Sequence, residues 1–133
     1  MLDTNILIYF MNRKPGFDRI ARHISGRSVG ELRLSAITYA ELRFGIEQGK
    51  LRAKNEAALL DLMEYFQIDD FPSGAATDFR KIKTALMKNG KPIGPYDMLI
   101  AAHARHVGAT LVTNNDVEFR RVPALSLQNW LEA

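Results

Sequence analysis

The sequence of 133 residues contains no cysteine. This absence excludes a disulfide-stabilised scaffold, a thiol nucleophile and any zinc site built on thiolates. The sequence also has no run of about 18 apolar residues, the length that crosses a bilayer. Its first residues lack the basic region and the small-residue cleavage site of a signal peptide. We therefore expect a cytoplasmic protein with no membrane segment.

The composition is that of an ordinary globular protein, with 47% hydrophobic and 25% charged residues. A chain of this length buries enough surface to form a core without a structural metal. Because no stretch resembles a linker, a repeat or a low-complexity tract, we expect a single domain spanning residues 1–133.

Charge is segregated along the chain, although the net charge is only +3. Residues 13–54 carry ten Lys and Arg against four Asp and Glu, residues 55–70 carry five acids and no base, and residues 80–91 carry five bases and no acid. Solvated helix faces are the simpler interpretation of such blocks. Basic faces that contact nucleic acid are the alternative, with Arg13, Lys14, Arg43 and the segment 88–91 as candidate phosphate contacts.

Helical and strand patterns alternate along the sequence. Apolar spacing of three and four residues, with glycine and proline at the ends, predicts helices. They are expected from residue 6 after a cap at residues 4–5, and over 17–24, 38–48, 51–66, 74–89 and 96–107. Short strands are expected over residues 1–3, 32–37, 67–69, 109–113 and 124–127. This alternation predicts a three-layer α/β/α domain with a mostly parallel central sheet of four to five strands.

Four acids follow strands or begin helices in this scheme. Asp3 follows the first strand, Glu41 lies in the first turns of the helix after residue 37, and Asp97 begins a helix two residues after Pro95. Asp116 lies just beyond the strand that ends near residue 113. Because ligands of an open α/β sheet bind beyond the carboxyl ends of its strands, these acids are expected to converge.

Electrostatics limits what such a cluster can do. Two carboxylates 4 Å apart repel by about 4 kcal/mol at an effective dielectric constant of roughly 20. Three or four of them therefore require protons or a bound cation. All-oxygen ligands select Mg²⁺ or Mn²⁺, which suits metal-dependent phosphodiester hydrolysis.

Four segments together resemble the PIN-domain ribonucleases and, more narrowly, the VapC toxins of bacterial toxin–antitoxin pairs. They are Leu2-Asp3-Thr4-Asn5, the segment from Ser35 to Leu42, Gly94-Pro95-Tyr96-Asp97 and Leu111-Val112-Thr113-Asn114-Asn115, with Glu118-Phe119 following. The resemblance covers nearly the whole chain in order. Only two residues precede Asp3, so either the first strand is unusually short or the numbering begins inside it.

The resemblance implies an Mg²⁺-dependent endoribonuclease that cleaves structured RNA such as tRNA and leaves a 5′-phosphate and a 3′-hydroxyl. It implies inhibition by a VapB-type antitoxin and a homodimer. Its motifs make Asp3 and Asp97 metal ligands, with Glu41 binding the metal directly or through water. Thr4, Asn5 and Thr113 become hydrogen-bonding support.

The fourth acid departs from the family pattern, which places an acid two residues after the threonine. Asn115 occupies that position and Asp116 follows it. Either Asp116 completes the catalytic set, which we favour, or Asn115 contributes an amide oxygen to a three-acid site.

Structural interpretations compete with these assignments. The residues Asp3, Thr4 and Asn5 are all good helix caps, Thr38 and Glu41 fit a capping box, and Asp97 could stabilise only a helix N-terminus. A non-catalytic RNA- or protein-binding module and a small-molecule phosphatase are the alternative functions.

Two further expectations concern residues outside the acid cluster. His103 and His106 are expected at the surface or an interface, because His103 lies about 240° around its helix from Asp97. Apolar residues near the N-terminus, such as Ile6, Tyr9 and Phe10, are expected to be exposed and to favour a homodimer.

Overall fold

The computed structural model describes residues 1–132 and consists of helices that alternate with short strands. The helices are α1 (Thr4–Met11), α2 (Phe17–Ser25), α3 (Ala36–Gln48), α4 (Arg52–Met63), α5 (Ala75–Lys88), α6 (Pro95–Val107) and α7 (Asp116–Phe119). The strands are β1 (Arg33–Ser35), β2 (Gln67–Asp69), β3 (Leu111–Val112) and β4 (Leu127–Gln128). No helix within residues 1–132 is long and apolar enough to span a membrane.

The strands form two parallel pairs, β1 with β2 and β3 with β4. Residues 1–3 lie between the pairs. The Leu2 amide donates to the Arg33 carbonyl at 3.1 Å, and the Asp3 amide donates to the Val112 carbonyl at 3.0 Å. The N-terminal segment therefore joins the two pairs, although only Leu2 forms a β-bridge of its own, to Val112. The expected α/β fold with a few parallel strands is confirmed.

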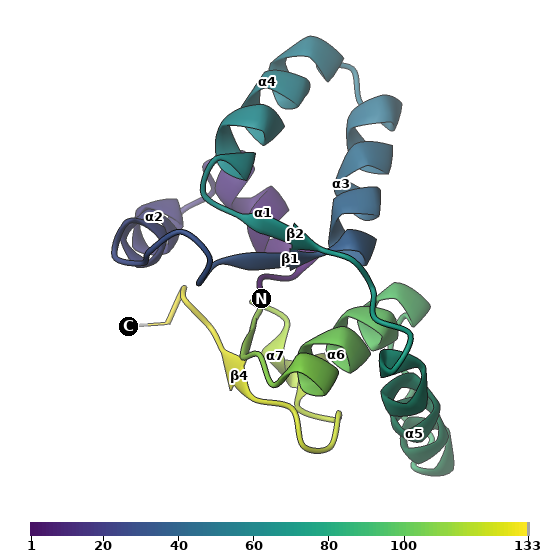
Figure 1. Ribbon diagram of the computed structural model, residues 1–133. Helices are drawn as coiled ribbons and strands as arrows, with labels where there is room; N and C mark the ends of the chain where they lie inside the picture. The colour runs from purple at the N-terminus through teal and green to yellow at the C-terminus, as the bar shows by residue number, and fades with distance from the viewer. Residues whose placement is uncertain (133) are drawn as a thin grey trace.

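Hydrophobic side chains fill the space on both sides of this strand layer. Consecutive residues alternate between the two cores, as strand geometry requires. Leu2 and Val112 belong to the core beneath α1 to α4, whereas Met1 and Leu111 belong to the core beneath α5 to α7. Figure 1 shows α1, α3 and α4 above β1 and β2, and α5, α6 and α7 below these two strands. Helices thus cover both faces of the strand layer, and Asp3 directly follows the paired residue Leu2.

Several element boundaries differ from the sequence-based expectation. Helix α3 begins at Ala36 and is capped by Ser35, whose hydroxyl accepts a hydrogen bond from the Ile37 amide at 3.1 Å. The expected cap at Thr38 is wrong because the chain already turns into the helix after three strand residues. Strands β3 and β4 are shorter than expected, and the four-residue helix α7 had no recognisable periodicity.

The N-terminal apolar residues that the sequence analysis expected at the surface are largely buried, although Ile8 of α1 is 40% exposed. Ile6 is fully buried, and Tyr9 and Phe10 are half-buried against the core. Helix α1 therefore uses these side chains to cover the strand layer. Large exposed apolar side chains also occur on other elements, among them Phe44 on α3 and Tyr96 on α6.

Candidate active site

Asp3 occupies the junction between the strand layer and α1. Its Oδ1 accepts a hydrogen bond from the Ile6 amide at 2.9 Å, so it caps the helix. Its Oδ2 accepts a hydrogen bond from the Thr113 hydroxyl at 2.5 Å. Asp3 is only 1% exposed. Burial raises its pKa to about 6, and the charges of Asp97 and Glu41 act in the same direction, while its two hydrogen bonds oppose the shift.

A hydrogen bond between α1 and α3 holds Glu41 close to Asp3. The hydroxyl of Thr4, the residue after Asp3, donates to Glu41 Oε1 at 2.6 Å. The carboxylate therefore points toward α1 and is not engaged in the capping box that Thr38 would require. The Thr38 hydroxyl itself is fully buried and has no hydrogen-bond partner within the described residues.

Asp97 lies in the first turn of α6, where Pro95 at the first helical position fixes the start of the helix. The carboxylate is half-buried, and burial raises its pKa to about 6. The charges of Glu41 and Glu118 raise the pKa of Asp97 further. A carboxyl group that only capped a helix would have a lowered pKa. Burial, with repulsion from the two acids added to it, therefore outweighs the helix dipole in setting the pKa of Asp97.

Glu118 joins the cluster through a relay of hydrogen bonds that begins at Asp3. Thr113, which donates to Asp3, accepts a hydrogen bond from the Asn115 amide at 2.9 Å. The Asn115 side-chain amide in turn donates to Glu118 Oε2 at 2.8 Å. The relay thus holds the carboxylate of Glu118, whose charge raises the pKa of Asp97. Sequence reasoning missed Glu118 as a site residue, although it sits three residues after Asn115 at helical spacing.

Asp116 and Asn5 take no part in this arrangement. Asp116 forms an ion pair with Arg120 at 2.7 Å and lies 3.5 Å from the Asn129 side-chain amide. Because α7 begins at residue 116, the helical turn directs Asp116 to one side and Glu118 to the other. Asn5 is exposed, and no hydrogen bond within residues 1–132 connects its side chain to the acids.

The expectation of a surface location is wrong for His103. Its side chain is 1% exposed, and its Nδ1 lies 2.8 Å from the Ser35 hydroxyl. Burial lowers the pKa of His103 and favours the neutral ring. His106, by contrast, is exposed and lies 3.0 Å from Asp78. These histidines stabilise the packing of α6 and stay out of the acid cluster.

The donor set consists of carboxylate, hydroxyl and amide oxygens, which is the chemistry that a hard divalent cation prefers. Within residues 1–132, no three Asp, Glu or His side chains form a closed ligand set around one point. Mg²⁺ does not require one, because it keeps several waters and binds through one or two carboxylates plus substrate phosphates. The site therefore suits a cation that keeps several water ligands, and it does not suit one coordinated by protein side chains alone.

Comparisons with known proteins agree with this geometry. The family model of the PIN domain matches residues 1–125. Ribonuclease VapC2 of Haemophilus influenzae is 42% identical over 98% of this chain and 97% of its own length. The chain belongs to the VapC ribonucleases of the PIN-domain family. The tRNA(fMet)-specific endonuclease VapC of Shigella flexneri is another relative, 35% identical over 98% of this chain and 96% of its own.

Solved structures of other VapC proteins share the fold of this VapC ribonuclease. VapBC2 from Rickettsia felis, bound to a promoter DNA fragment, aligns with a TM-score of 0.88 at 34% identity, covering 98% of this chain and 97% of that one. VapBC-1 from Haemophilus influenzae also aligns with a TM-score of 0.88. Its identity is 35%, and the alignment covers 99% of this chain and 98% of that one. The family recognised from the four sequence segments is confirmed, and nucleases of this family are metal-dependent.

Proposed function

We propose that this VapC ribonuclease hydrolyses phosphodiester bonds of RNA at the cluster of Asp3, Glu41, Asp97 and Glu118, with Mg²⁺ as the preferred ion and Mn²⁺ as a substitute. The observation that carries the proposal is the convergence of acids around buried Asp3, which is 1% exposed and next to Thr4, the residue that holds Glu41. In agreement with this geometry, the pKa of Asp3 and of Asp97 is raised to about 6. Burial and mutual repulsion disfavour the ionised carboxylates, and a divalent cation would relieve both effects.

We assign the four acids different roles in binding the ion. Asp3 and Asp97 would bind the ion directly, whereas Glu41 and Glu118 would hold its waters. Thr4, Thr113 and Asn115 fix these carboxylates through the hydrogen bonds described above. When bound, the ion supplies Lewis acidity and lowers the pKa of a coordinated water for attack on phosphorus. Asn115 thereby acts as a positioning residue, and Asp116 is replaced by Glu118 as the fourth acid.

The proposed substrate is a structured RNA such as a tRNA, in a cytoplasmic setting. Support comes from the relative in Shigella flexneri, whose name describes an endonuclease specific for tRNA(fMet). A VapB-type antitoxin is the proposed protein partner, because relatives of this chain have been solved as VapBC complexes.

The decisive experiment is cleavage of a defined tRNA with increasing Mg²⁺, followed by sequencing of the new RNA ends. We expect no cleavage in EDTA, loss of cleavage in Asp97→Asn, and full activity in the control Asp70→Asn, which changes an exposed acid outside the cluster. RNA that is retained but never cut, at any Mg²⁺ concentration, would overturn the catalytic proposal in favour of a non-catalytic RNA-binding module.

An apolar groove is the proposed docking site for the antitoxin. It encloses about 460 Å³ and lies between α1, α2 and α4, at the end of α1 opposite Asp3. Its apolar lining includes Phe10, Met11, Phe17, Ile24, Leu62 and Tyr65. Such a groove suits the apolar face of an amphipathic helix. Introducing a charge with Tyr65→Glu is expected to weaken inhibition by the antitoxin in a cleavage assay.

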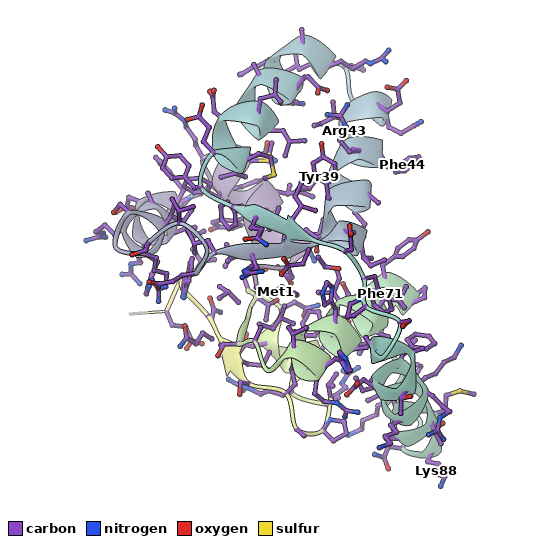
Figure 2. All side chains as sticks on the ribbon, in the orientation of Figure 1. Met1, Tyr39, Arg43, Phe44, Phe71 and Lys88 are labelled. Atoms are coloured by element: carbon purple, nitrogen blue, oxygen red, sulfur yellow. The ribbon has the colours of Figure 1, made fainter. Side chains whose placement is uncertain are left out.

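A homodimer is also proposed. Its interface would use other apolar side chains than the Ile6, Tyr9 and Phe10 that the sequence analysis suggested. Phe44 is 66% exposed and Tyr96 is 59% exposed, and each lies within one turn of a site acid. Figure 2 shows Phe44 pointing outward from α3. Light scattering at micromolar concentration should give the mass of a dimer, and Phe44→Ser should shift it toward the monomer.

A further inference from the structure

The outer face of α5 and the turn that follows it carry five exposed basic side chains. Ile82 and Leu86 are buried against α6 and fix which side of α5 faces inward. At about 100° per residue, Arg80, Lys81 and Lys88 fall on the outward side of the helix and Lys83 on its flank, while Lys91 follows in the turn after it. We define the α5 basic face as Arg80, Lys81, Lys83, Lys88 and Lys91, all of which are exposed.

These five cations have no carboxylate partners within the described part of the chain. Six arginines elsewhere pair with acids, whereas Arg13, Arg19, Arg27 and Arg121 are not paired with one within the described residues; the α5 face differs from these in gathering its unpaired cations on one helix and the turn after it. The paired arginines are Arg22, Arg33, Arg43, Arg52, Arg105 and Arg120. The one acid of α5, Asp78, is turned toward α6, where Arg105 and His106 contact it. The α5 basic face is therefore a surface of uncompensated positive charge.

The face also leads to the acid cluster. Asp78 near the start of α5 contacts Arg105 near the end of α6, so the two helices run antiparallel. The end of α5 consequently continues through residues 89–94 into the first turn of α6, which holds Asp97. Lys91 lies within this connection. Figure 1 shows α5 and α6 below β1 and β2, and Figure 2 shows Lys88 at the outer end of α5.

We propose that the α5 basic face holds the phosphate backbone of the RNA substrate and guides it to the acid cluster. The inference rests on the proposed function for the identity of the substrate. Acids at the site repel an approaching polyanion, so attraction must come from cations beside them. Exposed lysines supply charge without base recognition, which predicts a contribution to affinity that is independent of RNA sequence.

The test compares two charge-matched double variants in an Asp97→Asn background, where RNA stays intact. Lys81→Gln with Lys88→Gln removes two charges from the face. Lys50→Gln with Lys54→Gln removes two exposed charges near the junction of α3 and α4, which Figure 1 shows at the far end of the molecule from α5. Binding of one tRNA is measured by fluorescence anisotropy between 50 and 300 mM salt.

We expect the α5 double variant to bind roughly 30-fold more weakly at 0.1 M salt, with a salt slope shallower by about 1.5. The control pair should change affinity less than about threefold. With the native Asp97 restored, the α5 variant should raise KM and leave kcat unchanged, as expected for lost uniform binding. Matching thermal unfolding curves would show that all variants fold.

Equal losses in the two double variants would overturn the proposal, because net charge alone would then explain them. Wild-type RNA affinity combined with weaker antitoxin binding would also overturn it and assign the face to an acidic protein segment. These outcomes are separate from failure of the proposed function. A chain that binds RNA through α5 but never cuts it supports the surface and refutes the catalysis.

Discussion

The Thr4 hydroxyl donates a 2.6 Å hydrogen bond to Glu41 Oε1, although the two residues lie 37 positions apart in the sequence. This bond connects the start of α1 to α3 and places Glu41 beside Asp3. Because Glu41 is thus held by a side chain from another helix, its rotamer is set by tertiary structure and not by the cap of its own helix.

Removing the donor with Thr4→Val is expected to lower kcat about 10-fold and to raise the Mg²⁺ concentration needed for half-maximal activity. Valine fills the same space but cannot fix the Glu41 carboxylate, and loss of such supporting bonds usually costs 10- to 100-fold in metal affinity or activity. Initial rates across an Mg²⁺ titration measure both quantities. Thr4→Ser keeps the hydroxyl and should restore the rate. An unchanged Mg²⁺ requirement in Thr4→Val would assign the bond a purely structural role.

Glu118→Gln is expected to reduce cleavage about 100-fold, whereas Asp116→Asn should change it less than threefold. Glu118 raises the pKa of Asp97 and is oriented by Asn115, while Asp116 is paired with Arg120, whose side chain is 68% exposed. Surface pairs of this kind contribute under about 1 kcal/mol. Both variants are assayed on the same tRNA at saturating Mg²⁺. The opposite order of the two rates would restore Asp116 as the fourth acid.

Sequence alone predicted six of the seven helices of the described chain and singled out three acids that the structure places in one cluster. Helical periodicity and terminal Gly and Pro residues located α2, α5 and α6 to within one or two residues. The family segments identified Asp3, Glu41 and Asp97, which the structure brings into one electrostatically coupled group. These features are encoded locally or in motifs, so a single sequence is enough to find them.

The remaining features depend on contacts that no local pattern contains. Asp116 and Glu118 are both acids near the end of β3, and only the start of α7 decides which of them faces Asp97. The sequence suggests a surface position for His103, because its contact with Ser35 at the end of β1 arises only when the chain folds. Strands of two or three residues are likewise specified by their partners, because so short a segment has no recognisable alternation.

Thr38→Val is expected to stabilise the protein by about 1 kcal/mol. The Thr38 hydroxyl is fully buried and lacks a hydrogen-bond partner among the described residues, and burial of an unsatisfied polar group costs roughly 1–3 kcal/mol. Valine has nearly the same shape without the polar atom. Urea unfolding monitored by circular dichroism gives the free energy of unfolding. Destabilisation by more than about 1 kcal/mol would show that the hydroxyl is bonded in solution.

Asp3→Asn is expected to abolish cleavage and, at the same time, to stabilise the metal-free protein at pH 7.5 by up to about 3 kcal/mol. Burial raises the pKa of folded Asp3 to about 6, whereas an unfolded aspartate titrates near 3.9. Between these values Asp3 binds more protons in the folded chain than in the unfolded chain, so its contribution to the free energy of unfolding falls as pH rises from about 4 to 6. Asparagine keeps an oxygen to accept the Ile6 amide and carries no charge to desolvate.

The measurement is urea unfolding of both proteins in EDTA at pH 4, 5, 6 and 7.5. The two free energies should coincide at pH 4 and diverge as pH rises through 6, with the variant the more stable. Asp97→Asn should also be more stable than the wild-type protein at pH 7.5, but by a smaller amount, because that carboxylate is only half-buried and better solvated.

Adding Mg²⁺ at pH 7.5 should stabilise the wild-type protein and not Asp3→Asn, since a ligand that binds only the native state raises its stability. A difference between the two free energies that does not grow between pH 4 and 6 would contradict the raised pKa of Asp3 and, with it, the electrostatic argument for a bound cation.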